Sequence, residues 1–215
     1  MSLFLLLWKL ILMDAIIISI GYVIVCFCLT CAIGKKSTFV ARKFFHICMS
    51  CWWSIRLLFI NNDKLWAAIT VFLLIYVLLN AFYLKALDIG VLCFLVVISF
   101  MTWITTQFTY FVIPATSAML ILGFSDSLAA LIGRGYQKHY HKEYKKSIIG
   151  TITFTFISIV ILESICYKYN LKILFVNNLI FSIILALFEK MLFGKYDNIF
   201  IAFFVFIYMI FIGGN

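Results

Sequence analysis

The stretch ILGFSDSLAALIGRGYQKHYHKEYKKSIIGT, residues 121–151, places a polar, basic and glycine-containing loop between two apolar segments. The segment before it ends near Gly123, and the one after it begins at Ile148. Apolar runs of about 20 residues are typical of helices that cross a bilayer. Asp126 stands directly after the first segment, and an acid at membrane depth is costly unless it is paired or bound to a metal. The stretch therefore predicts membrane helices on both sides of a reaction site.

The composition of the whole chain supports this interpretation. Of its 215 residues, 66% are hydrophobic and 12% are charged, and the mean hydropathy is +1.17. A soluble domain is about 45–50% apolar and about 25% charged. We therefore predict an all-α, polytopic integral membrane protein. Residues 1–14 form an N-terminal interfacial segment and residues 15–215 a single membrane domain. Eight spans are expected, at residues 15–33, 44–60, 65–84, 89–106, 110–123, 148–167, 173–188 and 199–212.

The distribution of basic residues predicts the orientation. Twelve of the 17 Lys and Arg residues fall on one side of this eight-span arrangement, and five fall on the other. The positive-inside rule places the richer side in the cytoplasm. The longest loop, with Asp126, lies on that side. We therefore expect the active face to be cytoplasmic.

Net charge and cysteine placement indicate what the chain does not do. The formal net charge of +9 does not indicate nucleic-acid binding, because that function needs a basic face on a soluble scaffold. The seven cysteines lie almost entirely in apolar runs, where a buried thiol behaves as a small hydrophobe. We predict neither a zinc site nor a disulfide framework. Glu163, inside a span, is interpreted as a residue that packs helices together.

The first candidate group is the sequence ARKFFH, residues 41–46, at the entry to the second span. Arg42 and His46 are four residues apart, so on a helix they share a face and can approach one ligand together. The alternative is a basic membrane anchor with an incidental histidine.

The second group is the loop itself. Asp126 can hold a divalent cation, while Arg134, Lys145 and Lys146 can neutralise phosphate oxygens. Its glycines, Gly133, Gly135 and Gly150, let the backbone approach a ligand closely. We expect Asp126 to open a short helix that ends near Gly133. The alternative is a helix cap that is ion-paired with Arg134 or a lysine.

The third group consists of Glu189, Asp197 and Asn198, which bracket a turn on the cytoplasmic side. Two carboxylates and an amide supply oxygen ligands of the kind that Mg²⁺ binds. The alternative is that Asp197 or Asn198 caps the last span and Glu189 pairs with a neighbouring lysine.

Taken in this order, the groups resemble the membrane-bound lipid kinase family that includes dolichol kinase, phytol kinase and the CTP-dependent diacylglycerol kinase of yeast type. The resemblance covers residue 42 to the C-terminus. The matching residues are Arg42-Lys43-x-x-His46, Asp126 through Gly133-Arg134, Lys146-Ser147-x-x-Gly150-Thr151, and Glu189 with Asp197-Asn198.

The resemblance implies Mg²⁺-dependent transfer of the terminal phosphate of a nucleotide, typically CTP, to the hydroxyl of a membrane lipid alcohol such as polyprenol, phytol or diacylglycerol. The residues themselves leave the choice between CTP and ATP open, because the chain has no Walker-type loop. It implies Asp126 and Asp197 as metal ligands and Asn198 as a supporting oxygen ligand. Glu189 or His46 accepts the hydroxyl proton, and both remain candidates. The remaining site residues contact phosphates or the nucleotide: Arg42, Lys43, Gly133, Arg134, Lys145, Lys146, Ser147 and Gly150.

The chain also departs from the family pattern. Ser125 stands where the family has a glycine before the central Asp, and Ile149 stands where it has an acid between Ser147 and Gly150. An inactive relative of the kinases is therefore one alternative. Another is a CTP:phosphatidate cytidylyltransferase, which would release pyrophosphate rather than CDP. A non-catalytic membrane transporter is the alternative from a different class, although the sequence has no evident internal repeat.

Overall fold

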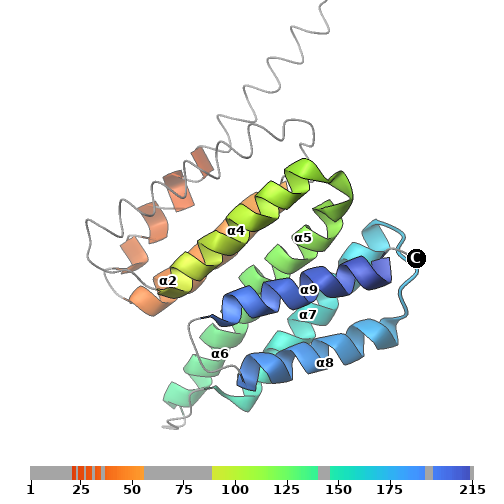
Figure 1. The fold of residues 1–215 in the computed structure, drawn as a ribbon. Helices are drawn as coiled ribbons and strands as arrows, with labels where there is room; N and C mark the ends of the chain where they lie inside the picture. The colour runs from red at the N-terminus through yellow and green to blue at the C-terminus, as the bar shows by residue number, and fades with distance from the viewer. Residues whose placement is uncertain are drawn as a thin grey trace, which may run out of the picture.

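The structure is a computed structural model that describes residues 21–34 (without 23, 27 and 31), 37–55, 89–139, 146–191 and 196–213. The described part is all helical, as the sequence predicts (Figure 1). Its elements are α2 (Thr38–Ile55), α4 (Ile89–Gln107), η1 (Thr109–Phe111), α5 (Val112–Leu120), η2 (Ile121–Ser125), α6 (Asp126–His139), α7 (Ile148–Lys168), α8 (Phe175–Met191) and α9 (Asp197–Gly213).

Three helical stretches in the described part are long and apolar enough to cross a membrane: Gly90–Gln107, Thr109–His139 and Ile148–Lys168. The shorter helix Asp197–Ile212 is apolar as well. These helices match the spans predicted at residues 89–106, 110–123, 148–167 and 199–212. The predicted span at 65–84 and the interfacial segment at 1–14 lie outside the described residues, so the full set of eight spans remains a prediction.

One continuous helix, Thr109–His139, forms the centre of the bundle. It comprises η1, α5, η2 and α6, and 67% of its most apolar window is buried, against 28% for α7. Asp126 is the first residue of α6, as expected, but the expectation that this helix is short and ends near Gly133 is wrong. Asp126 instead follows the five-residue π-helical turn η2 without a break, and α6 continues to His139. Of the two glycines in α6, Gly133 packs closely against the start of α7, whereas Gly135 meets nothing within 4 Å.

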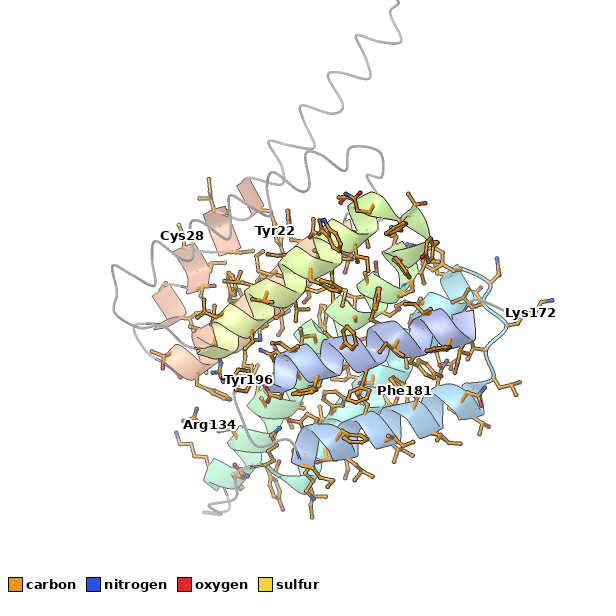
Figure 2. All side chains as sticks on the ribbon, viewed as in Figure 1. Tyr22, Cys28, Arg134, Lys172, Phe181 and Tyr196 are labelled. Carbon is orange, nitrogen blue, oxygen red and sulfur yellow. The ribbon has the colours of Figure 1, made fainter. Side chains whose placement is uncertain are left out.

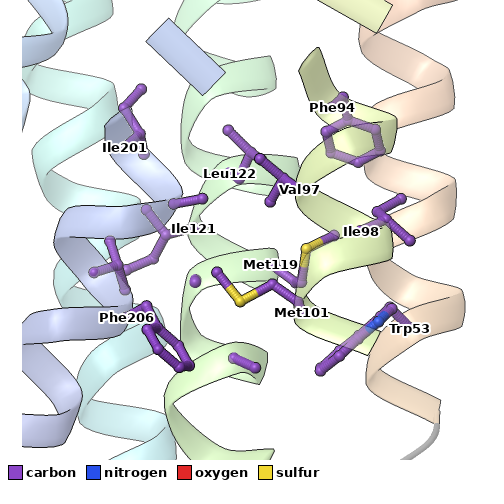
Figure 3. Packing of buried hydrophobic residues seen from close by; sticks show 14 of the residues in the cluster. Trp53, Phe94, Val97, Ile98, Met101, Met119, Ile121, Leu122, Ile201 and Phe206 are labelled. Atoms are coloured by element: carbon purple, nitrogen blue, oxygen red, sulfur yellow. The ribbon is translucent and has the colours of Figure 1, made fainter. Parts of the chain in front are cut away.

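The apolar core surrounds this central helix. Figure 3 shows Phe94, Ile98 and Met101 of α4 facing Met119 of α5, with Trp53 of α2 on one side. On the other side α9 contributes Ile201 and Phe206 to the same cluster. The central helix is thus enclosed by helices that follow and precede it in the chain.

Hydrogen bonds outside the core fix the directions of the helices. The side-chain nitrogen of Asn198 donates to the carbonyl of Gly90 at 2.9 Å, so α4 and α9 begin at the same end of the bundle. Asn170, with a φ of 51°, follows α7 and turns the chain back into α8 at the opposite end. An asparagine tolerates this left-handed conformation better than most residues. The starts of α4, α7 and α9 and the end of α8 therefore share one end.

At the opposite end, a buried polar network joins three helices. Asn178 of α8 donates to Glu163 of α7 at 2.7 Å and accepts from the hydroxyl of Tyr208 of α9 at 2.7 Å. This arrangement confirms the interpretation of Glu163 as a packing residue. Since each of these groups has a partner, the network stabilises the bundle rather than exposing a reactive group.

The packing of α2 against η2 depends on a residue without a side chain. A Cβ atom at Gly123 would lie 2.0 Å from Oγ of Ser50, whereas one at Gly135 would meet nothing within 4 Å. We predict that Gly123→Ala lowers stability by about 1–3 kcal/mol because the helices must separate. Gly135→Ala is the matched control and is expected to be neutral or slightly stabilising.

Thermal unfolding of the detergent-solubilised variants, followed by circular dichroism, measures this difference. Ser50→Gly in the Gly123→Ala background should recover part of the loss. Equal melting temperatures for the two single variants would contradict the close packing of α2 against η2.

Candidate functional site

A polar cavity of about 380 Å³ lies at the end of the bundle where α7 and α9 begin and α8 ends. The helices α2 and α6 form its other walls. Its lining consists of Phe39, Arg42, Lys43, Asp126, Ala129, Ala130, Gly133, Arg134, Gln137, Lys146, Ser147, Gly150, Thr151, Glu189 and Asp197. The cavity therefore collects residues from all three of the groups that the sequence singles out.

Three carboxylates converge in this cavity. Asp126 begins α6, Glu189 lies in the last turn of α8, and Asp197 begins α9. One oxygen from each can be chosen so that all lie within 4.8 Å of one another. Their side chains are largely buried, with 4%, 12% and 21% of their surface exposed. Such a cluster needs compensating positive charge.

Lys43 compensates Asp126. The ammonium of Lys43 lies 2.5 Å from Oδ2 of Asp126, and the side chains of both residues are almost completely buried. This ion pair connects α2 to α6 across 83 residues of sequence. Asp126 is thus ion-paired with a lysine, as the alternative interpretation of the loop predicts. The partner, however, comes from residues 41–46 and not from the loop.

Lys146 compensates the other two acids. Its ammonium lies 2.6 Å from Oε1 of Glu189 and 3.6 Å from Oδ2 of Asp197. It also donates a hydrogen bond to the backbone carbonyl of Glu189. The start of α7 is therefore held to the end of α8 and the start of α9.

Burial affects the acids that end α8 and begin α9. It raises the pKa of Glu189 above its usual range, and Lys146 opposes this effect. Burial raises the pKa of Asp197 as well, with Asp126 adding to the increase and Lys146 opposing it. Both carboxylates would be further stabilised in their charged form by an additional nearby cation.

Two arginines of the cavity lining lie over an aromatic ring that the sequence analysis missed. The guanidinium carbon of Arg134 lies 4.3 Å from the ring centre of Phe39, and that of Arg42 lies 5.8 Å away. Phe39 precedes Arg42 by three residues, so helical spacing could have identified it. Figure 2 shows Arg134 on α6 and Tyr196 just before α9 at this end, and Lys172 at the other.

The glycines and Ser147 shape the contact between α6 and α7. A Cβ at Gly133 would lie 2.6 Å from Oγ of Ser147, and one at Gly150 would lie 3.0 Å from the carbonyl oxygen of Ala129. Ser147 caps α7, because its Oγ accepts from the backbone nitrogen of Gly150 at 3.0 Å. All three residues line the cavity. The contacts that the structure shows for them are contacts between α6 and the start of α7.

Two predicted site residues, His46 and Asn198, are described by the structure but are not part of the cavity lining. The ring of His46 stacks on Phe94 at 4.1 Å and is 1% exposed, and neither ring nitrogen has a hydrogen-bond partner among the described residues. Asn198 is 3% exposed, and its side-chain nitrogen is bonded to Gly90. Lys145 lies outside the described residues. The chemical roles predicted for these three remain predictions.

The donor set of the cavity fits a magnesium ion. Carboxylate oxygens are hard ligands, and Mg²⁺ is usually bound by one or two of them together with waters and substrate phosphates. Asp126, Glu189 and Asp197 offer more than this minimum within 4.8 Å. The four cations around them, Arg42, Lys43, Arg134 and Lys146, suit an anionic ligand.

Comparison of the chain with protein-family models, with curated proteins and with solved structures finds no match. The interpretation of the cavity therefore depends on its own geometry.

The buried pair of Lys43 and Asp126 has a measurable consequence. We predict that Asp126→Asn lowers stability by about 3–5 kcal/mol, because it leaves the charge of Lys43 buried without a partner. The double variant Lys43→Met/Asp126→Asn removes both charges and should recover most of the loss. Asp197→Asn is the matched control, since the Asp197 side chain is 21% exposed and its loss should cost less.

Thermal unfolding in detergent and a double-mutant cycle test this expectation. An Asp126→Asn variant as stable as the unchanged protein would show that the pair does not hold α2 against α6.

Proposed function

We propose that this protein transfers the terminal phosphate of a nucleotide, CTP rather than ATP, to the hydroxyl of a membrane lipid alcohol at the cytoplasmic face. The observation that carries the proposal is the convergence of Asp126, Glu189 and Asp197 within 4.8 Å, in a cavity that also holds four cations. Phosphoryl transfer depends mainly on positioning and on neutralising charge, and this combination provides both. The likeness of the sequence to lipid kinases supports the same reaction.

The cations bind and orient the nucleotide. Arg42 and Arg134, held by the ring of Phe39, bind phosphate oxygens as they enter. Lys146 binds the phosphate nearest the carboxylates. A magnesium ion held by Asp126 and Asp197 would supply further neutralisation of the phosphate charge. Lys43 keeps the carboxylate of Asp126 charged and in place.

Glu189 is the better of the two candidates for the proton acceptor. It lines the cavity, and its raised pKa makes it a stronger base than an exposed carboxylate, whereas His46 is stacked on Phe94 outside the lining. The lipid hydroxyl gives its proton to Glu189 as its oxygen bonds to the terminal phosphorus. The bond from that phosphorus to the bridging oxygen breaks, and the nucleoside diphosphate leaves.

The departures from the family pattern are compatible with this reaction. The cavity takes Lys146, Ser147, Gly150 and Thr151 from the start of α7, and Ile149 is not part of its lining. An acid at position 149 would therefore not stand among these lining residues, and the third carboxylate of the cavity comes from Glu189. The loss of the family acid does not leave the site with a single carboxylate.

A radiochemical assay tests the proposal. Protein in detergent is incubated with magnesium, γ-labelled CTP or ATP, and a panel of polyprenol, phytol and diacylglycerol. We predict that label enters one lipid and that Glu189→Gln lowers kcat by roughly 10²–10⁴-fold, the usual range for a lost general base. Glu163→Gln is the matched control, because it makes the same substitution in the structural network at the opposite end of the bundle.

The products distinguish the alternatives. Release of pyrophosphate, with label from α-labelled CTP in the lipid, would establish cytidylyl transfer instead of a kinase reaction. No transfer with any pair from folded protein would overturn the enzymatic proposal and favour a transporter or an inactive relative.

The acceptor is expected to reach Glu189 and Asp197 along the seam between α8 and α9. Phe188 of α8 and Phe204 of α9 stack across this seam with ring centres 5.5 Å apart, and both are exposed. Phe203, next in sequence and similarly exposed, instead lines an apolar groove between α9 and α4. We therefore propose the seam as the route, because Glu189 follows Phe188 in α8 and Asp197 begins α9.

We predict that Phe204→Ala raises KM for the lipid about fivefold or more, because a lost aromatic contact of about 1 kcal/mol has this effect. KM for the nucleotide should not change. Phe203→Ala is the control and should leave both constants unchanged. Equal effects of the two substitutions would contradict entry along the seam.

A further inference from the structure

The ammonium of Lys146 contacts carboxylate oxygens that a metal ion would also bind. It is held by Glu189 at 2.6 Å and Asp197 at 3.6 Å, together with the backbone carbonyl of Glu189. These two carboxylates are also two of the three that would surround a metal ion. The same oxygens therefore have two possible positive partners.

The two partners cannot be held together without cost. A magnesium ion binds oxygen at about 2.0–2.1 Å, so an ammonium in contact with the same carboxylates would lie only a few ångströms from it. Like charges at such a distance repel each other strongly in a partly buried site. Binding of the metal requires Lys146 to move away from Glu189 and Asp197.

Lys146 contacts two of the three carboxylates and is more exposed than Lys43. The side chain of Lys146 is 23% exposed at the cavity, while that of Lys43 is 7% exposed and paired with an equally buried Asp126. Lys146 also precedes the helical residues of α7, whose cap Ser147 fixes the backbone but leaves the lysine stem outside the helix. The flexible four-carbon stem lets the ammonium turn towards the cavity.

We propose that Lys146 is a built-in counter-cation, which keeps metal affinity low until a nucleotide phosphate offers its ammonium a new partner. This inference depends on the proposed function, since it assumes that the cavity takes a metal and a nucleotide. Phosphates that enter the cavity draw Lys146 from the carboxylates, and Asp197 and Glu189 then become available. Metal and nucleotide therefore bind together rather than independently.

The consequence is a thermodynamic coupling between two ligands. If the nucleotide raises the affinity for the metal by a given factor, the metal raises the affinity for the nucleotide by the same factor. Removal of the charge of Lys146 should abolish most of this coupling. A purely structural lysine would affect stability without changing the coupling.

The test measures binding of Mn²⁺, used as a probe for the magnesium site, to the full-length protein in detergent. Free Mn²⁺ is followed by electron paramagnetic resonance, with and without a CTP analogue that has a methylene bridge between its β and γ phosphorus atoms. For the unchanged protein we expect the analogue to raise Mn²⁺ affinity roughly tenfold or more, within the usual range of such couplings.

The variants separate charge from structure. Lys146→Met is expected to bind Mn²⁺ roughly tenfold more tightly than the unchanged protein without the analogue, and to gain little when it is added. Lys146→Arg keeps the charge and should keep the weak metal binding and the coupling. Lys138→Met removes the same charge from an exposed position on α6 and should bind Mn²⁺ as the unchanged protein does.

Two other results would overturn either this inference alone or the proposed function as well. If Lys146→Met binds Mn²⁺ no more tightly than the unchanged protein, the proposed counter-cation role of Lys146 is wrong. The metal site and the proposed function then still stand. If the unchanged protein and all variants fail to bind Mn²⁺ with or without the analogue, the proposed function fails as well. Should Lys146→Met not fold, Lys146→Gln removes the charge with a smaller change in polarity, and the same two results apply.

Discussion

The buried ion pair between Lys43 and Asp126 is the interaction on which the rest of the site depends. Asp126 belongs to the central helix, and an isolated carboxylate at its depth would be too costly to bury. Lys43 brings α2 to the point where α6 begins, and this fixes one wall of the cavity. With Asp126 held in this way, Glu189 and Asp197 complete a cluster that only positive charge can stabilise.

Some of this arrangement could be predicted from the sequence, because hydropathy and charge act locally along the chain. Long apolar runs identified the helices that could cross a membrane, and the alternation of sides placed Asp126, Glu189 and Asp197 at one end. The partner of Asp126 could not be predicted in the same way. Arg134 and several lysines were equally suitable by sequence, and the choice of Lys43, 83 residues away, depends on how α2 packs.

The central helix shows a second limit of sequence reasoning. A polar residue after an apolar run looks like the beginning of a new helix, and Ser125-Asp126 was interpreted in this way. The π-helical turn η2 instead passes through this point without interruption, and such turns are frequent at functional sites. The glycines after Asp126 suggest close approach of a ligand, but Cβ atoms at Gly133 and Gly150 would meet Ser147 and Ala129 of the neighbouring helix segments. Helix packing and ligand binding use the same residue type, and spacing does not distinguish them.

The two polar clusters described above differ in how their charges are paired. In the network of Glu163, Asn178 and Tyr208, donors and acceptors match one another without a lysine or arginine, so no cation is held there for an anionic ligand. At the other end Lys43 holds Asp126 in a buried pair, while the more exposed Lys146 holds Glu189 and Asp197 with a charge that could also bind phosphate. An ion pair that can exchange one partner for a substrate is stable when the substrate is absent and reactive when it is present. The same pairing that permits the acids to be buried therefore suits the anionic ligand of the proposed reaction.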